Sequence, residues 1–179
     1  MGVKLASARG LNSIFEPGLV LLNTQTFSAA NTISFPDNTF TAAYNAYSFV
    51  LNVTGSTAVN VRARLRANGV DNSSANYNRA NWESITITSS RESNETSLLV
   101  GETYDTNQRR RIMSFNLFDP QVSGRYTSGH TISIADLDGA VYPIQRYHGV
   151  AVTTSYDSIT FFPNTGTITG SISCYGYNQ

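Results

Sequence analysis

TFTAAYNAYSFVLNVTGSTAVNVRARLRANG, residues 39–69, is the stretch of sequence that decides the fold. Between residues 59 and 66 it reads VNVRARLR, in which apolar and polar side chains alternate strictly. Alternation with a period of two predicts a β-strand that has one buried face and one solvated face. The solvated face carries Arg62, Arg64 and Arg66 in register, and Asn68-Gly69 closes the segment with a turn signal.

The same alternation recurs along the rest of the chain, and no amphipathic helix interrupts it. Turn residues separate the segments; Asp138-Gly139, between two apolar runs, predicts a tight hairpin. Many short strands at this spacing predict an all-β protein, a β-sandwich or a barrel, and of the two we expect an antiparallel β-sandwich. A polar, Asn-rich loop is expected at residues 71–81. The expected strands are 19–27, 32–35, 47–54, 59–66, 84–88, 97–102, 111–118, 131–135, 141–147, 149–154, 158–162 and 167–175.

At 179 residues the chain is expected to form one domain preceded by an arm. Residues 1–18 mix small, cationic and apolar types without a helix or strand period, which predicts an extended N-terminal arm. Leu11, Ile14 and Phe15 are its candidate attachment residues. Pro17-Gly18 marks the boundary, because the residue before a proline is disfavoured in a helix. The β-sandwich domain is therefore expected over residues 19–179.

Charge is sparse and balanced in this sequence. Only 13% of the residues are charged, and the formal net charge is zero. A neutral chain has no long-range field to attract a polyanion, which argues against nucleic-acid binding even though residues 109–111 are three arginines. No apolar run is long enough to predict membrane insertion. Cys174 is the only cysteine, so no intrachain disulfide is expected.

Residues that could carry catalysis are few. The histidines His130 and His148 stand outside any zinc or triad motif and are expected to be structural or solvent-exposed. Glycoside hydrolysis needs two carboxylates that can be distant in the chain, so sequence alone leaves this activity open. Nothing distinguishes one acidic candidate from another, and we expect no enzyme, no cofactor and no metal site. The acidic candidates are Glu83, Glu102, Asp105 and Asp119.

Three aromatic residues in or next to the most polar region are candidate ligand contacts. They are Tyr77, Trp82 and Tyr104. Exposed aromatic rings among Asn, Ser and Asp residues bind sugar rings by stacking and by hydrogen bonds from planar amides. The simpler alternative is that Trp82 packs into the end of the sandwich.

The buried core follows from alternation within each expected strand, because large aromatic and β-branched residues occupy the inward face. The expected core residues are Tyr44, Tyr47, Phe49, Leu51, Val59, Val61, Leu65, Ile85, Ile87, Met113, Phe115, Leu117, Ile132, Ile134, Ile159, Phe161, Ile168 and Ile172.

Two parts of the sequence carry a family resemblance. Tyr44-Asn-Ala-Tyr47 followed by the arginine strand, and the closing G-x-I-x-x-Y-G of residues 170–176, resemble the compact β-sandwich modules of tailed-bacteriophage virion proteins. Such modules occur in tail fibres and surface proteins of phages, notably those of marine and cyanobacterial hosts. The resemblance covers residues 19–178 and implies a jelly-roll-like sandwich, usually trimeric, on a virion surface. Attachment is expected through residues 1–18 or through the sandwich itself, since no long N-terminal shaft is visible.

Three functions follow as hypotheses. The first is a tail- or fibre-associated surface protein that contributes to host attachment, with a host surface glycan as a partner. The second is a capsid decoration protein that stabilises the head shell, and the third is a virion-associated glycan-degrading enzyme, which the lack of an identifiable acid/base pair disfavours.

In each case we expect a homotrimer that contacts other virion proteins and is located in the virion after assembly in the host cytoplasm. Arg62, Arg64 and Arg66 are the candidate contacts between subunits, because arginine makes bidentate bonds with carboxylates and a row of like charges needs counter-charges opposite.

Overall fold

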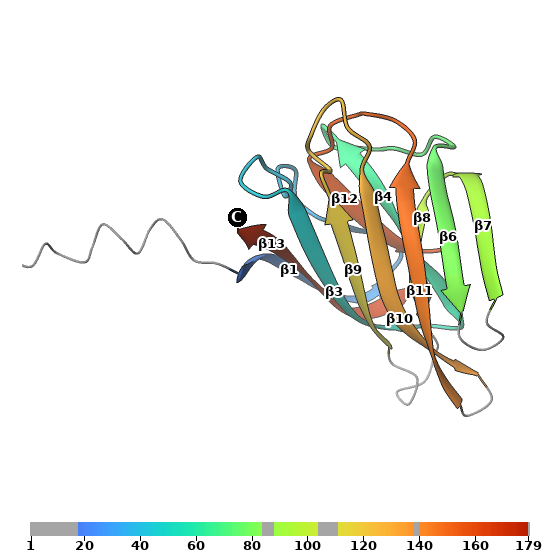
Figure 1. Cartoon of the computed structure of the whole chain (residues 1–179). Helices are drawn as coiled ribbons and strands as arrows, with labels where there is room; N and C mark the ends of the chain where they lie inside the picture. The colour runs from blue at the N-terminus through green and yellow to red at the C-terminus, as the bar shows by residue number, and fades with distance from the viewer. Residues whose placement is uncertain (1–17, 84–87, 104–110, 138–139, 179) are drawn as a thin grey trace, which may run out of the picture.

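The computed structural model describes residues 18–83, 88–103, 111–137 and 140–178, and these residues form strands, turns and bends without a helix (Figure 1). The strands are β1 (Gly18–Ala30), β2 (Ile33–Ser34), β3 (Ala46–Gly55), β4 (Val59–Ala67), β5 (Val70–Asp71), β6 (Tyr77–Glu83), β7 (Thr88–Glu95), β8 (Leu98–Thr103), β9 (Arg111–Phe118), β10 (Ser128–Leu137), β11 (Ala140–Val150), β12 (Ser158–Pro163) and β13 (Ile168–Asn178).

The strands form two antiparallel sheets that pack together as a β-sandwich. The larger sheet has eight strands in the order β1-β13-β3-β9-β10-β11-β6-β7. The smaller sheet has the order β2-β12-β4-β5, and β8 also pairs with β4. Beyond β9 the larger sheet continues through β10, β11, β6 and β7, and we call these four strands the wing (Figure 1). The all-β antiparallel sandwich expected from the sequence is the observed architecture.

The deciding stretch forms β3 and β4, one in each sheet. In β4 the apolar positions are buried and the three arginines are only partly buried, as the alternation predicts. Before β3 the chain turns at a tyrosine corner. The Tyr47 hydroxyl accepts a hydrogen bond from Thr41 N at 2.7 Å and donates one to Thr41 O at 2.9 Å. These two bonds tie the incoming segment to the strand, so Tyr47 is both a core residue and a clamp.

Aromatic rings dominate the core between the two sheets. Phe49 is fully buried, and its ring centroid lies 5.5 Å from Phe35, 5.8 Å from Phe115 and 5.3 Å from Phe161. Aromatic pairs at such distances contribute about 0.5–1.5 kcal/mol each beyond the burial of their area. The four rings come from both sheets, so this cluster joins the two layers.

Most of the expected core residues are buried. The exceptions among the described residues are Tyr44, which is partly buried against the core, and two isoleucines of β10. Ile85 and Ile87 lie outside the described residues. The buried members of the expected set are Tyr47, Phe49, Leu51, Val59, Val61, Leu65, Met113, Phe115, Leu117, Ile159, Phe161, Ile168 and Ile172.

The prediction of which face of β10 points into the core was wrong. Ile132 and Ile134 were expected in the core, yet both are exposed, whereas Thr131 and Ser133 are buried. Alternation places the two pairs on opposite faces of the strand but does not say which face points inward. The buried hydroxyls are needed by polar groups of β11, as the next subsection shows.

Other departures from the expected strands also lie in the wing. The loop expected at residues 71–81 is wrong in its second half, because Tyr77–Glu83 forms β6. The inward positions Arg79 and Asn81 are polar, so no apolar period reveals this strand. The strands expected at 141–147 and 149–154 are one strand that ends at Val150. Strand β7 was not predicted, and most of the strand expected at 84–88 lies outside the described residues.

The ends of the described chain lie together. Gly18 at the start of β1 is opposite Asn178 near the end of β13. Residues 1–17, which include the proposed arm residues Leu11, Ile14 and Phe15, lie outside the described residues. Strands β10 and β11 pair up to Leu137 opposite Ala140, and the tight turn expected at Asp138-Gly139 lies outside the described residues. Within the described part of the chain, no helix has the length and apolar character needed to cross a membrane.

Candidate functional site

The inner face of the wing is polar, in contrast to the aromatic core beside it. Arg146 of β11 is fully buried, and its guanidinium donates to Ser133 Oγ at 3.1 Å and to Glu102 Oε1 at 3.0 Å. Arg79 of β6 is also buried and forms an ion pair with Glu92. Burying a guanidinium is costly unless such partners accompany it, so these contacts fix how β6, β8, β10 and β11 pack.

His148 completes this buried layer. Its Nε2 lies 2.9 Å from Thr131 Oγ1, and its ring meets Phe115 edge to face at a centroid distance of 5.8 Å. Burial, and then the positive charges of Arg146 and Arg79, lower the pKa of His148 to about 3. The imidazole is therefore neutral at physiological pH, and its role is structural, as the sequence led us to expect.

The predicted arginine row has its counter-charges within the same chain. Arg62 Nη1 lies 3.5 Å from Glu95 Oε2 and 3.1 Å from Ser97 Oγ. Arg64 Nε donates to a backbone carbonyl at residue 96, and its guanidinium carbon lies 4.8 Å from the centroid of the Phe162 ring. These contacts remove the reason for expecting a neighbouring subunit to neutralise the row, although they do not test the expected interface itself.

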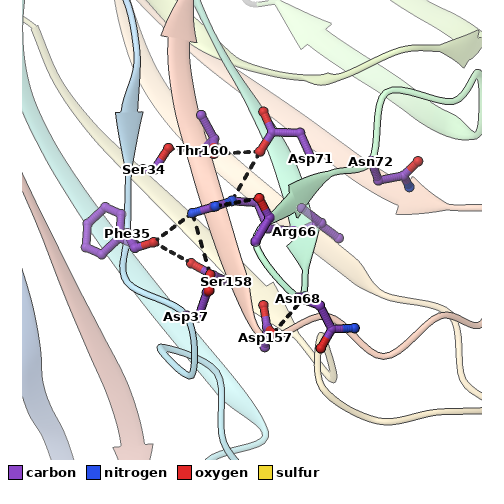
Figure 2. Close-up of polar contacts among 12 residues, drawn as sticks. Ser34, Phe35, Asp37, Arg66, Asn68, Asp71, Asn72, Asp157, Ser158 and Thr160 are labelled. Atoms are coloured by element: carbon purple, nitrogen blue, oxygen red, sulfur yellow. Dashed lines mark hydrogen bonds and ion pairs between the residues drawn. The ribbon is translucent and has the colours of Figure 1, made fainter.

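Arg66 has the largest set of contacts in the row (Figure 2). Its guanidinium donates to Phe35 O at 3.1 Å and to Gly69 O at 2.8 Å. Its Nε lies 3.3 Å from Asp71 Oδ1, and a second carboxylate, that of Asp37, lies 3.7 Å from Nη1. Figure 2 shows that these partners surround the guanidinium from β5 and from the segment after β2. Arg66 therefore stabilises the smaller sheet, and this cluster is structural.

The three predicted ligand aromatics do not form one site. Tyr77 is buried; its hydroxyl accepts from Leu65 N at 3.2 Å and donates to Asn72 O at 2.8 Å. Burial raises the pKa of Tyr77, and the ring cannot stack on a ligand, so this prediction was wrong. Trp82 is 40% exposed on the outer face of β6 and does not plug the end of the sandwich. Tyr104 lies outside the described residues.

A hollow of about 330 Å³ lies where β7, β6 and β11 are adjacent. Trp82 does not line it but lies at its margin, two positions along β6 from the lining residue Ala80. Tyr147, at its wall, is 54% exposed and was not singled out by the sequence. The available signal was Gly149 inside a strand, because a strand glycine often marks a place where a ligand approaches the backbone. The residues lining the hollow include Asn78, Ala80, Arg91, Ser93, Tyr147 and Gly149.

The outer face of the larger sheet also carries an apolar patch. Val50, Ile112, Ile132 and Ile134 are 39%, 64%, 46% and 49% exposed, respectively. Ser114 lies between Val50 and Ile132, and Ile112, two positions along β9 on the same face, is a diagonal neighbour of both, so the patch crosses β3, β9 and β10 around this serine. We call these four side chains the outer patch. Exposed apolar patches on one face of a monomer are often functional.

The acidic candidates for catalysis are separated in their contacts. Glu102 binds Arg146, whereas Asp119 lies 3.5 Å from Arg125. Nothing is described of the Glu83 side chain or of Asp105. In the described ranges no group of three or more His, Cys, Asp or Glu residues is placed to hold a metal ion.

Comparisons with known proteins do not identify the family or the function of this chain. No protein-family model, no curated protein and no solved structure matches the chain.

Proposed function

We propose that this chain is a structural protein of a bacteriophage virion, a tail- or fibre-associated surface component that contributes to host attachment. The observation that carries the proposal is the outer patch, because a broad apolar sheet face is the feature of an assembly protein. The resemblance of residues 44–69 and 170–176 to phage β-sandwich modules supplies the virion context. A second copy of the chain is the partner that we assign to the patch.

We also infer that the sandwich is a jelly roll enlarged by the wing. In the larger sheet the order begins β1-β13-β3-β9, and in the smaller sheet it is β2-β12-β4 with β8 beside β4. The first strands of the chain thus pair with the last ones in both sheets, β1 with β13 and β2 with β12. This pairing arises when one long antiparallel ribbon folds over to form two layers. Jelly rolls of this kind serve as viral capsid and lectin domains, which supports a virion role by fold analogy alone.

The size and chemistry of the outer patch suit a contact between copies. A standard interface buries about 800 Å² on each partner, with an apolar centre and a polar rim. The outer patch, with Ser114 within it, supplies the mainly apolar centre, and the neighbouring Asn52 and Gln145 supply an uncharged rim. Because no charge of one sign dominates these positions, a second copy meets no repulsion there.

The test is the mass of the purified chain in solution. We expect light scattering to give about three times the 19.5 kDa chain mass, as a homotrimer requires. Ile112→Asp combined with Ile132→Asp should convert this species to monomer, because two carboxylates would be buried without partners. Val70→Asp is the matched control, since Val70 is 69% exposed on β5 of the other sheet. A wild-type monomer, or a trimer that survives the double substitution, would refute the assignment.

A capsid decoration protein is the second candidate, favoured by the same patch because clamping shell subunits needs a broad contact and no ligand. Antibodies against the chain, viewed by electron microscopy on purified particles, distinguish the two. Labelling of the tail supports the attachment role, labelling of the head shell supports the decoration role, and unlabelled particles contradict both.

A further inference from the structure

The hollow on the wing can admit a ligand because two of its lining residues, Gly149 and Ala80, are small. Gly149 has no side chain, and an added Cβ there would meet no atom within 4 Å. Ala80 is the next small residue on this face, and it lies opposite Tyr147 on β11 and Arg91 on β7. A small-residue floor between larger side chains leaves room for one ring of a ligand, and its volume of about 330 Å³ is at the lower end for ligand pockets.

Aromatic rings flank this floor. Tyr147 is exposed, and its hydroxyl donates to Gln145 Oε1 at 3.1 Å, which restrains the ring. Trp82 lies opposite Gln145, so it is a diagonal neighbour of Tyr147 on the same face of the sheet. Two exposed aromatic rings beside a floor of small residues form a platform for the apolar face of a sugar ring.

The polar groups of the hollow favour a negatively charged ligand. Arg91 is exposed at its edge, and within the described ranges no carboxylate lies at ion-pair distance from it. Glu92 also lines the hollow, but its carboxylate is paired with Arg79, and the Glu95 carboxylate is paired with Arg62. A guanidinium matches a carboxylate in a bidentate way, whereas the Asn78 amide and the Ser93 hydroxyl, also at the hollow, suit sugar hydroxyls.

We propose that this hollow binds one ring of an acidic saccharide. The ring stacks on Tyr147, its carboxylate pairs with Arg91, and its hydroxyls bond to Asn78 and Ser93. The outer patch lies on β3, β9 and β10, whereas the hollow lies on β11, β6 and β7, so both contacts can be occupied together. This inference rests on the proposed role in host attachment, because it names the class of host ligand that the chain would bind in that role.

The experiment is a glycan array probed with the full-length chain, carrying uronic-acid saccharides, sialylated saccharides and neutral saccharides of matched length. We expect acidic saccharides to be retained, with binding weakened by added salt because the contact with Arg91 is ionic. Retention of neutral saccharides alone, or of no saccharide, would overturn the proposal.

Variants locate the site by calorimetric titration with an acidic trisaccharide from the array and its neutral counterpart. Tyr147→Ala should weaken binding of the acidic trisaccharide at least about tenfold, and Arg91→Gln should remove the preference for the acidic form by a similar factor. Gly149→Leu should abolish binding by filling the hollow. Tyr126→Ala, which removes an exposed tyrosine elsewhere, is the control and should bind like wild type.

Unchanged binding in the three site variants would refute the assignment of the hollow, and far-ultraviolet circular dichroism confirms that each variant is folded. The two proposals fail in distinguishable ways. A chain that is found on particles but binds no acidic saccharide contradicts only the site, whereas a chain that binds the saccharide but is absent from particles contradicts only the virion role.

Discussion

Replacing His148 with glutamine tests whether the buried layer of the wing depends on a neutral imidazole. The pKa of this group falls from 6.5 to about 3 on folding, chiefly because burial excludes water and then because Arg146, Arg79 and His130 add positive charge. The unfolded chain therefore binds a proton at a pH where the folded chain cannot. Stability from this group is complete above pH 6.5 and is lost as the pH falls from 6.5 toward 3.

The size of the effect follows from the two pKa values. Each pH unit within that window lowers the free energy of unfolding by about 1.4 kcal/mol. Between pH 7.5 and pH 5.0 the wild-type chain should therefore lose about 2 kcal/mol through His148 alone. His148→Gln removes the titration and keeps a polar side chain opposite Thr131, so this part of the loss should vanish. The variant is expected to be less stable than wild type at pH 7.5 and to approach it at pH 5.0.

Urea unfolding at both pH values, followed by circular dichroism, measures this difference. Carboxylates also titrate near pH 5, but they do so in wild type and variant alike, so their contribution cancels in the comparison. His130→Gln is the matched control, because His130 lies on the outer face beside Asn116 and adds the smallest part of the shift in the pKa of His148, so this variant should still lose stability much as wild type does. Equal losses of stability in wild type and His148→Gln would refute the buried, neutral imidazole.

Two further predictions concern packing and backbone. Leu65→Ala should lower the free energy of unfolding in urea by about 2–5 kcal/mol, because the Leu65 side chain is fully buried. Arg64→Ala should lower it by about 1 kcal/mol, since this variant loses one hydrogen bond and one ring contact. The reverse order would show that the faces of β4 are wrongly assigned. Gly170→Ala should lower the thermal midpoint strongly, because Gly170 has φ +145° and its Cβ would lie 2.1 Å from Asn52 O. Gly149→Ala should leave that midpoint unchanged, and equal shifts in the two variants would contradict the geometry.

The sequence was sufficient to predict the elements whose inward residues are apolar. Strands β3 and β4 were found because their buried positions are Val, Leu, Ala and Phe, which contrast with polar neighbours. Strand β6 was missed because Arg79 and Asn81 occupy its inward positions. A periodicity argument assumes that the interior is apolar, and in the wing this assumption does not hold.

Of the three aromatic residues expected at a ligand site, only Trp82 is exposed near the hollow, and it lies at the margin and not in the lining. Tyr77 is also an aromatic residue in polar sequence surroundings, so it was expected to contact a ligand. It stands an odd number of positions from Trp82 on the same strand, and its side chain therefore faces the interior. Tyr147 comes from another strand, and only the pairing of β11 with β6 brings it next to Trp82. Such a juxtaposition depends on strand order, which no local pattern in a single sequence encodes.

The polar inner face of the wing and the exposed isoleucines of β10 have one common cause. Because Arg146 and His148 point inward, hydroxyl groups on neighbouring inward positions of β10 bond them: Thr131 bonds His148 and Ser133 bonds Arg146, each from a diagonal position in the strand pair. Strand geometry then places Ile132 and Ile134 on the outer face, where they are 46% and 49% exposed. The outer face of β10 therefore keeps exposed apolar side chains, while the inner face is held by hydrogen bonds and an ion pair. A wing with this division of faces is stable in the chain and apolar toward a neighbour, which is the physical basis for assigning the outer patch to assembly.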